Sequence, residues 1–333
     1  MFQPLSLEWI YASPAETGKK KEIYSMNQFD LFFRIFIFPG FLFLLIIALF
    51  LHWFDRKLIA RFQDRIGPPW YQPLADLVKL FAKEDILPSG TNLFFATLLP
   101  LTSFASVLTA SFYLPIGIQS APSFQGDFIV LMFLLSIPSL LYFLAGWITG
   151  GVYSVIGGNR SLLQYFSYEV LFLLAMSGTA IASGSWSLAD IRLAQIKEGP
   201  YIFPQIAGFL LSLAGLIGKL KREPYDIPKA KSEVIAGALT EFSGKKLALW
   251  YLTIQLQTVV GLSYLTHCFF SGFWQMNTIS GFIIFLLLLI ILQCLLSAIS
   301  AIYARLRIDQ LIRLNWYIFI PLSLLHNIYI LLI

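Results

Sequence analysis

Charged residues are scarce in this sequence, and that scarcity excludes most soluble folds. Only 12% of the 333 residues are Asp, Glu, Lys or Arg, whereas 58% are hydrophobic. A soluble domain carries about 25% charged residues. A water-soluble fold of this size could not bury so much apolar surface, so lipid must be the solvent for much of the chain. The 31 Phe and 8 Trp residues suit lipid-facing and interfacial positions.

Cysteine and histidine are rare as well, which limits the chemistry. Cys268 and Cys294 both lie in apolar runs, and no Cys-x-x-Cys pair is present, so neither a disulfide framework nor a metal site is indicated. His52, His267 and His326 are each isolated. No nucleophile–base pair, phosphate-binding loop or cofactor motif is visible. We therefore expect no metal, no cofactor and no catalysis by this chain alone.

Eight apolar runs are long enough to span a bilayer, whose core of about 30 Å needs roughly 20 helical residues. The expected spans are 31–52, 93–114, 127–149, 165–184, 201–218, 247–272, 278–302 and 314–333. The sequence thus predicts an all-α integral membrane protein, a bundle of about eight transmembrane helices with amphipathic helices in its cytoplasmic loops. We expect a single membrane domain over 1–333, with a polar extracytoplasmic segment at 1–30.

Basic residues gather in alternate loops of this eight-span arrangement. Of the 23 Lys and Arg residues, 17 lie in the loops 53–92, 150–164, 219–246 and 303–313. Lys and Arg mark the cytoplasmic side of a membrane protein. The net charge of +5 therefore reports orientation and not nucleic-acid binding. This predicts a multi-pass protein of the cell membrane with both termini extracytoplasmic.

The first basic loop contains two expected helices. Lys57, Arg61 and Arg65 are spaced four apart and would share one face of a helix that continues from the first span. The Gly-Pro-Pro run at 67–69 would end that helix. A second, amphipathic helix follows over about 74–83, and its periodicity alone is typical of an interfacial helix with snorkelling cations.

The same loop resembles part of one membrane subunit of respiratory complex I, the subunit next to the peripheral arm, which is the H subunit in bacteria and subunit 1 in mitochondria. That family has an acidic residue before Arg-Lys, then Gln-x-Arg-x-Gly-Pro, then Gln-Pro-x-Ala-Asp-x-x-Lys-Leu-x-x-Lys-Glu. The matching residues are Asp55 (Glu in the usual pattern), Arg56, Lys57, Gln63, Arg65, Gly67, Pro68, Gln72, Pro73, Ala75, Asp76, Lys79, Leu80, Lys83 and Glu84.

Further matches lie along the rest of the chain, from about residue 38 to 325. They resemble the family's Tyr-Glu-Val, Arg-x-Pro-Phe-Asp, Glu-Leu-Val and Arg-x-Arg-x-Asp-Gln-Leu motifs. The residues that carry them are Tyr168, Glu169, Arg222, Asp226, Glu233, Glu241, Arg305, Arg307 and Asp309. Glu169 is the only clear acidic residue within an expected span, and an ionisable group there is costly in lipid unless it has a function.

The resemblance implies the membrane anchoring and coupling subunit of a redox-driven ion pump. Electrons would move through iron–sulfur clusters in soluble cytoplasmic partners, beside antiporter-like membrane subunits. Proton relay and coupling would fall to Tyr168, Glu169, Asp226, Glu233 and Glu241. Docking to the soluble arm, or the lining of a quinone-like cavity, would fall to Asp55, Arg56, Arg61, Arg65, Gln72, Asp76, Lys79, Arg222, Arg305, Arg307 and Asp309.

Two departures from the family pattern affect this interpretation. Complex I has several more residues between its Gly-Pro and Gln-Pro motifs. In this chain only residues 69–71 separate Gly67-Pro68 from Gln72-Pro73. The short form resembles energy-converting membrane-bound nickel–iron hydrogenases and ferredoxin-linked relatives, which would place a nickel–iron centre in a partner and argues against a standard quinone site. Lysines also replace three family acids, at Lys219, Lys229 and Lys231. If those lysines pair with the loop carboxylates, the loop is an ion-pair latch and not a relay.

Other functions remain open at this stage. A quinone-reducing complex I subunit is the alternative within the same family. A purely structural docking platform would have no proton path. A stand-alone secondary transporter would have a site at the bilayer centre and internal repeats, and no clear repeat is visible. Identifying the soluble subunits that co-purify with the chain would separate these hypotheses.

Overall fold

The computed structural model describes residues 36–37, 40–114, 123–274 and 278–332, except for the side chains of residues 231 and 232. The predicted N-terminal segment 1–30, the position of Arg34 and the side chain of Lys231 therefore lie outside the described residues. The chain divides into two compact units, Met1–Phe43 and Leu44–Ile333. The architecture below is that of the larger unit.

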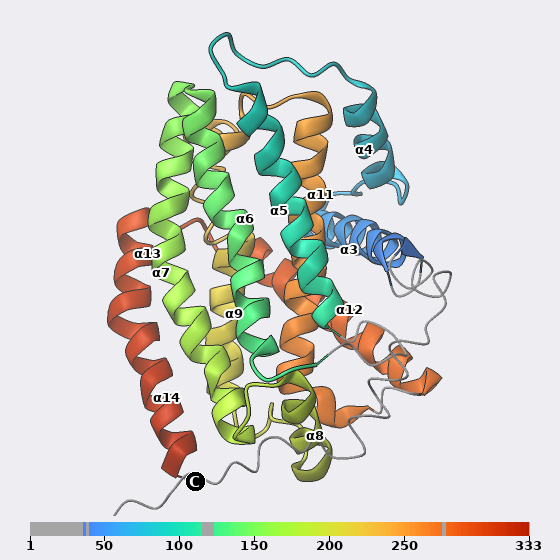
Figure 1. Cartoon of the computed structure of the whole chain (residues 1–333), viewed down its shortest axis with the longest axis vertical. Helices are drawn as coiled ribbons and strands as arrows, with labels where there is room; N and C mark the ends of the chain where they lie inside the picture. Colours follow the sequence, from blue (N-terminus) through green and yellow to red (C-terminus); the bar gives the residue numbers. More distant parts are fainter. Residues whose placement is uncertain (1–35, 38–39, 115–122, 275–277, 333) are drawn as a thin grey trace, which may run out of the picture. The chain divides into compact units, whose positions relative to one another are not determined.

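Every regular element in the described residues is a helix (Figure 1). The α-helices are α3 (Phe41–Phe62), α4 (Gln72–Ala82), α5 (Leu93–Tyr113), α6 (Asp127–Thr149), α7 (Val152–Ser183), α8 (Leu188–Glu198), α9 (Ile206–Leu220), α10 (Lys231–Val234), α11 (Gly244–Phe269), α12 (Ile279–Ile302), α13 (Ile308–Leu314) and α14 (Ile320–Leu332). Short 3-10 turns occupy Gly237–Leu239 and Ser271–Phe273, and a π-helical segment, Asn315–Phe319, joins α13 to α14.

Five of these helices are long and apolar enough to cross a membrane. They are α5, α6, α7, α12 and the continuous run Ile308–Leu332. The apolar helix α9 has only 15 residues, about 22 Å at 1.5 Å per residue. The chain is thus an all-helical protein with membrane-spanning helices, while the expected number of about eight is not established by helix length and composition.

Two predicted helix boundaries are wrong. Helix α7 begins at Val152, so Arg160 lies on a helix and not in a loop over 150–164. Helix α3 ends at Phe62, before the Gly-Pro-Pro run, so Arg65 does not share a helical face with Lys57. The helix stops there because Asp64 adopts a left-handed conformation (φ 55°) while the Arg65 amide donates to the carbonyl of Ala60 at 2.7 Å, the pairing of a Schellman cap.

Helix α7 packs against α6, α9 and α14 in the larger unit (Figure 1). Glycines allow two of these helices to come very close. A Cβ at Gly218 of α9 would lie 2.7 Å from the Cβ of Tyr168, and one at Gly215 would lie 2.9 Å from the Cβ of Phe172. The backbone of α9 therefore lies directly on α7, which determines what the side chain of Lys219 can reach.

The loops between helices meet in two groups. In the first group, the Ile86 amide, in the segment after α4, donates to Ser243 Oγ at 2.7 Å, and the Leu306 amide, before α13, donates to the carbonyl of Pro224 at 3.0 Å. Near α8, the Ile202 amide donates to the carbonyl of Phe269 at 3.0 Å. Three of the four basic loops of the sequence, 53–92, 219–246 and 303–313, therefore meet in the first group, away from the second.

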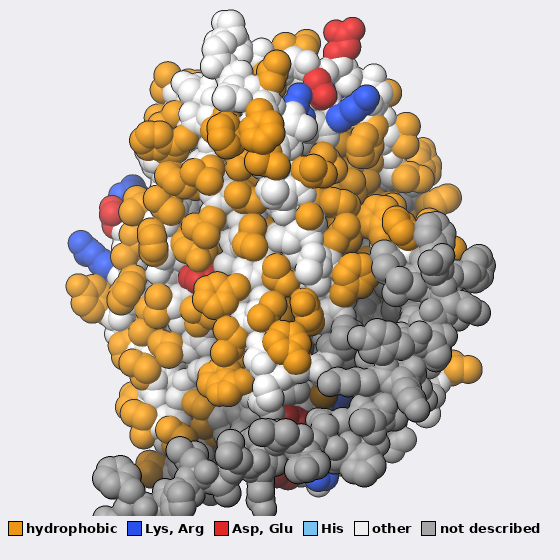
Figure 2. Space-filling view, viewed as in Figure 1, with side chains coloured by type: hydrophobic (Ala, Val, Ile, Leu, Met, Phe, Trp, Pro, Cys, Tyr) orange, Lys and Arg blue, Asp and Glu red, His pale blue; other side chains and the backbone are white. Residues whose placement is uncertain are grey.

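The outer surface of the helices is apolar. Large exposed hydrophobic side chains run along α5, α6, α12 and α14. In Figure 2 hydrophobic side chains cover the middle of the visible face, and most of the visible Lys, Arg, Asp and Glu side chains lie toward its ends and edges. This distribution suits helices that face lipid or other membrane subunits.

Candidate functional site

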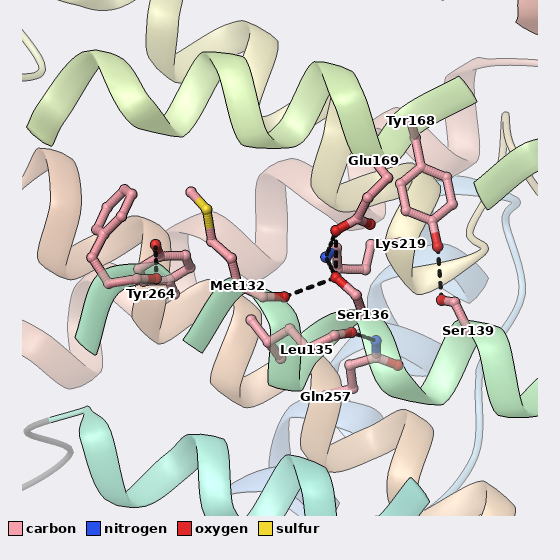
Figure 3. A network of polar contacts seen from close by, with 10 residues as sticks. Met132, Leu135, Ser136, Ser139, Tyr168, Glu169, Lys219, Gln257 and Tyr264 are labelled. Atoms are coloured by element: carbon pink, nitrogen blue, oxygen red, sulfur yellow. Dashed lines mark hydrogen bonds and ion pairs between the residues drawn. The ribbon is translucent and has the colours of Figure 1, made fainter. Parts of the chain in front are cut away.

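A buried ion pair lies between α7 and α9. The ammonium Nζ of Lys219 is 3.0 Å from Oε1 of Glu169, and the two side chains are 0% and 10% exposed. Because Gly215 and Gly218 bring α9 against α7, Lys219 projects directly at the carboxylate (Figure 3). A buried charge must be paired, and each of these groups supplies the other's partner.

The Ser136 hydroxyl (Figure 3) and the Phe172 ring complete the surroundings of this pair. Lys219 Nζ also donates to Ser136 Oγ at 2.8 Å and lies 4.6 Å from the centre of the Phe172 ring. The Ser136 hydroxyl hydrogen-bonds to Glu169 Oε1. The ammonium group thus has two hydrogen-bond acceptors and one aromatic face, whereas Glu169 Oε2 is buried without a hydrogen-bond partner among the described residues.

Tyr168, the neighbour of Glu169, is fully buried, and its hydroxyl donates to Ser139 Oγ at 2.7 Å. Ser136 and Ser139 are both on α6, three residues apart, so α6 presents hydroxyl groups to two successive residues of α7. The structure thus brings the predicted residues Tyr168 and Glu169 into one polar layer between α6, α7 and α9.

A small cavity lies on the other side of Lys219. It measures about 10 Å³, roughly the room that one water molecule requires. Its polar lining consists of Lys219, Lys221, Lys229, Tyr142, Trp250, Thr253 and Gln257. The cavity joins the end of α9 to the loop 221–243, which contains the predicted coupling carboxylates.

The three predicted carboxylates of this loop have different surroundings. Glu233 is on the surface, 49% exposed, where it pairs with Arg160 and with Arg305, the latter at 3.2 Å. Its hydrogen bond to Arg160 holds the pKa of Glu233 below the usual glutamate value. Glu241 is half-buried against the turn between α6 and α7 at Gly151.

Asp226 is half-buried beside Lys229. Burial lowers the pKa of the Lys229 amine, and the nearby Asp226 carboxylate opposes that shift. Of the three lysines that replace family acids, Lys219 pairs with the membrane carboxylate Glu169 and Lys229 lies near a loop carboxylate. The lysines therefore do not all pair with the carboxylates of the loop, because Lys219 pairs with Glu169 inside the helix bundle.

Asp55 forms the second polar centre. Its Oδ1 accepts hydrogen bonds from Arg222 Nη1 at 2.8 Å, Gln293 Nε2 at 2.8 Å and Ser297 Oγ at 2.6 Å. One carboxylate thus ties α3 to the loop after α9 and to α12. Among the predicted docking residues, the structure brings Asp55 and Arg222 together in this clamp.

A third polar group lies between α3 and α4. Asp76 accepts hydrogen bonds from Arg56 Nη1 at 2.9 Å and from Gln72 Nε2 at 2.8 Å. Burial raises the pKa of Asp76, but these two bonds outweigh it and hold the pKa below the usual aspartate value. Five further predicted docking residues are exposed: Arg61, Arg65, Lys79, Arg307 and Asp309.

The sequence did not reveal the roles of three buried polar residues, of which it had singled out only Lys219. The role of Lys219 as the partner of Glu169 was hidden because pairing depends on how α7 and α9 pack, although the glycines just before it were a signal. Ser136 resembled an ordinary residue of an apolar span. Asp127, the first residue of α6, is fully buried and accepts from the Leu188 amide at 2.8 Å, so Glu169 is not the only acidic residue of a span.

Known proteins resemble this chain over most of its length. A family model described as NADH dehydrogenase matches residues 35–331. The H subunit of NADH-quinone oxidoreductase from Dehalococcoides mccartyi is 32% identical over 310 residues, which cover 90% of this chain and 86% of that protein. The H 2 subunit of NADH-quinone oxidoreductase from Geobacter sulfurreducens is 33% identical over 299 residues, which cover 85% of this chain and 90% of that protein.

The fold also matches a solved structure. A chain of the membrane-bound sulfane sulfur reductase, an archaeal respiratory membrane complex, superposes with a TM-score of 0.81 at 27% identity, covering 87% of this chain and 96% of that one. Within the described residues no group of three or more His, Cys, Asp or Glu side chains is arranged to hold a metal ion.

Proposed function

The chain belongs to the NADH dehydrogenase family, and from this premise we propose that it is the membrane anchoring and coupling subunit of a redox-driven ion pump. Soluble subunits carrying iron–sulfur clusters would transfer the electrons. This chain would hold the soluble subunits at the membrane. It would also convert the change in charge or conformation that electron transfer causes into proton movement. It would work within an oxidoreductase complex without catalysing the redox reaction itself.

The single observation that carries this proposal is the buried Glu169–Lys219 pair, linked by a small cavity to the loop 221–243. A buried ion pair is weak evidence for stability, because removing two charges from water costs about as much as their attraction returns. Ionisable groups inside a membrane bundle are functional by default. A platform that only held the soluble arm would have no need of them.

For the type of complex, we favour a hydrogenase-like or ferredoxin-linked one over a quinone-reducing one. The direct connection from Gly67 to Pro73 supports this version, and so does the fold of the sulfane sulfur reductase chain. A nickel–iron centre would then reside in a partner. The alternative is a quinone-reducing complex, which the names of the sequence relatives favour. In that case the exposed apolar side chains around α4, such as Trp70, Leu74 and Val78, would border the quinone cavity.

For the topology, we propose eight spans with both termini extracytoplasmic in the cell membrane. The helices α3, α9 and α11 would join the five long apolar ones. The grouping of the basic loops near α4 supports this arrangement, because those loops carry most of the Lys and Arg residues. We retain one membrane domain over 1–333, with 53–92 and 219–246 as the cytoplasmic coupling loops.

For the partners, we propose that a basic surface made of Arg56, Arg61, Arg65, Arg305 and Arg307 receives the soluble arm. Three of these side chains, Arg61, Arg65 and Arg307, are exposed. Charge of one sign speeds and orients association and is weakened by salt. Antiporter-like membrane subunits would cover part of the apolar outer face.

The test is the Glu169→Gln variant of the complete complex, purified with its soluble subunits and placed in proteoliposomes. Reduced methyl viologen serves as electron donor, and protons, polysulfide and a quinone analogue are offered separately as acceptors. We expect a loss of at least tenfold in protons moved per electron. Unchanged coupling would show that the chain is a docking platform, and the acceptor that supports turnover would decide between the two versions.

A further inference from the structure

Three lysines from one short stretch of chain line the same small cavity. Lys219 is in the last turn of α9, Lys221 follows that helix, and Lys229 lies eight residues further on. Lys221 is 8% exposed, and its Nζ lies 4.3 Å from the centre of the Tyr142 ring. Lysine is almost never buried unless it is paired. Lys219 is paired with Glu169, and Lys229 is half-buried beside Asp226. No ion pair joins the buried Lys221 to a carboxylate of the described residues, so its place at this cavity calls for an explanation.

Lys219 connects this cavity to the membrane carboxylate. It belongs to the cavity lining and also lies 3.0 Å from Glu169 Oε1. The other carboxylate oxygen, Oε2, is buried without a hydrogen-bond partner among the described residues, in a side chain that is 10% exposed. The amine of Lys219 therefore lies between a space for water and a carboxylate with one oxygen that has no hydrogen-bond partner among the described residues.

We propose, on the basis of the coupling function above, that Lys219, Lys221 and Lys229 are a string of proton-carrying amines that leads from the loop 221–243 to Glu169, and that Lys219 keeps metal cations away from this carboxylate. A proton passes from the Lys219 ammonium to Glu169, which leaves a neutral amine and a neutral carboxylic acid. The amine takes a proton from the cavity water, and Lys221 or Lys229 gives one back to that water. Glu169 must release its proton into the bundle before Lys219 can transfer the next one.

The charges around Glu169 favour protons over metal ions. A cation such as Na⁺ needs several oxygen ligands, as hard cations generally do. Here the position beside Oε1 is taken by an ammonium group, which repels a second cation at close range in a poorly solvated interior. A neutral amine, in contrast, accepts a proton directly. The same residue thus admits protons and excludes Na⁺.

The surroundings of the two loop lysines support proton exchange. Burial lowers the pKa of Lys221 well below the usual lysine value, and the nearby Lys229 ammonium adds to this shift. Burial likewise lowers the pKa of Lys229. Both amines therefore give up a proton more readily than an exposed lysine does.

The decisive variant is Lys219→Arg in the complete complex, reconstituted as for Glu169→Gln. Arginine keeps the positive charge, so an ion pair with Glu169 can persist, but it does not release its proton in proteins. We expect protons moved per electron to fall at least tenfold. If turnover itself stops, the proton leak under an imposed pH gradient is measured instead, and the same loss is expected.

Lys197→Arg is the matched control, because Lys197 is exposed on α8 at the opposite end of the larger unit; it should behave as the unchanged complex. Normal coupling in Lys219→Arg would overturn the proposal and make Lys219 a structural counter-ion. If Glu169→Gln also couples normally, the coupling function itself fails; if only Lys219→Arg does, the failure is confined to the amines.

The choice between ions is tested by replacing Na⁺ with choline at constant ionic strength. The Lys219-dependent part of transport is the difference between the unchanged complex and Lys219→Arg. We expect this difference to persist without Na⁺, whatever Na⁺ movement other membrane subunits perform. A difference that disappears with Na⁺ would contradict the assignment of protons to this passage.

Discussion

Asp55 anchors the start of the loop 221–243 to α3 and α12. One of its oxygens accepts from Arg222, in the loop after α9, and from Gln293 and Ser297, which lie one turn apart on α12. The Asp55 and Arg222 side chains are 11% and 17% exposed. Removing the carboxylate would leave a mostly buried guanidinium without this partner, and breaking a buried pair costs about 3–5 kcal/mol.

We therefore predict that Asp55→Ala destabilises the loop 221–243 by roughly 3 kcal/mol, the lower end of that range because the pair is not completely buried. Limited trypsin digestion of the purified complex should cut this loop at least tenfold faster than in the unchanged protein. Asp309→Ala is the control, since Asp309 is exposed on α13. Equal cleavage rates in the two variants would contradict the clamp.

Glu233 gives a pH dependence with a defined sign. Its pKa is lowered in the folded protein, chiefly by the hydrogen bond from Arg160. The stabilisation is therefore complete above the usual glutamate pKa of about 4.3 and is lost as the pH falls through the lower, folded value. Because the side chain is half exposed, the effect should be small and local.

The measurement compares hydrogen exchange over 231–239 in Glu233→Gln and in the unchanged protein, always at the same pH. At pH 7 the variant should exchange faster. The difference should shrink as the pH falls below the usual glutamate pKa of about 4.3 and toward the lower pKa of the folded protein. A difference that grows on acidification would mean that the ion pairs with Arg160 and Arg305 do not hold the loop.

At the scale of elements, the contact between α7 and α9 is what creates the buried pair. Gly218 leaves no room for a side chain beside Tyr168, since a Cβ would lie 2.7 Å from the Tyr168 Cβ. Helix α9 is also short, so Lys219 comes at its last turn, just where the loop begins. The end of α9 thus places Lys219 beside Glu169 in the bundle interior, while Lys221 and Lys229, which follow the helix, line the cavity.

We predict that Gly218→Val separates α9 from α7, at an overpacking cost of about 1–3 kcal/mol, and pulls Lys219 away from Glu169. Protons moved per electron should fall at least fivefold. Ala207→Val adds similar bulk on the exposed side of the same helix and should have little effect. If both variants couple equally well, the close approach of the helices is not needed for coupling.

At the scale of the whole molecule, the two groups of loops predict which ends of the helices lie on the same side of the membrane. Gln63 is exposed between α3 and α4, and Lys197 is exposed on α8. These positions belong to different groups. They can therefore report sidedness independently of any assay of function.

We predict that Gln63→Cys is protected from a membrane-impermeant maleimide in intact cells and reacts in inverted vesicles, while Lys197→Cys does the reverse. Both changes are made after Cys268 and Cys294 have been replaced by Ala. Labelling of position 63 from outside the cell would reverse the proposed orientation. Labelling of both positions from one side would rule out the proposed alternation of spans.

The membrane character, the helical class and most helix positions were predictable from the sequence, because apolar runs of fixed length and basic loops are local features that lipid enforces. The amphipathic helix α4 followed from its period in the same way. Helix ends were less predictable. The cap at Asp64 and the early start of α7 depend on single backbone conformations and on neighbouring elements.

The partners of the polar groups were decided only by the tertiary structure. The sequence by itself determined that Glu169 lies in an apolar span and that lysines replace three acids, but not that one of those lysines, fifty residues away, pairs with it. That pairing requires the glycines of α9 to lie against α7. The same holds for Glu233, whose partners come from α7 and from the segment before α13. A buried charge is stable only with a partner, and which partner it finds depends on how the helices pack.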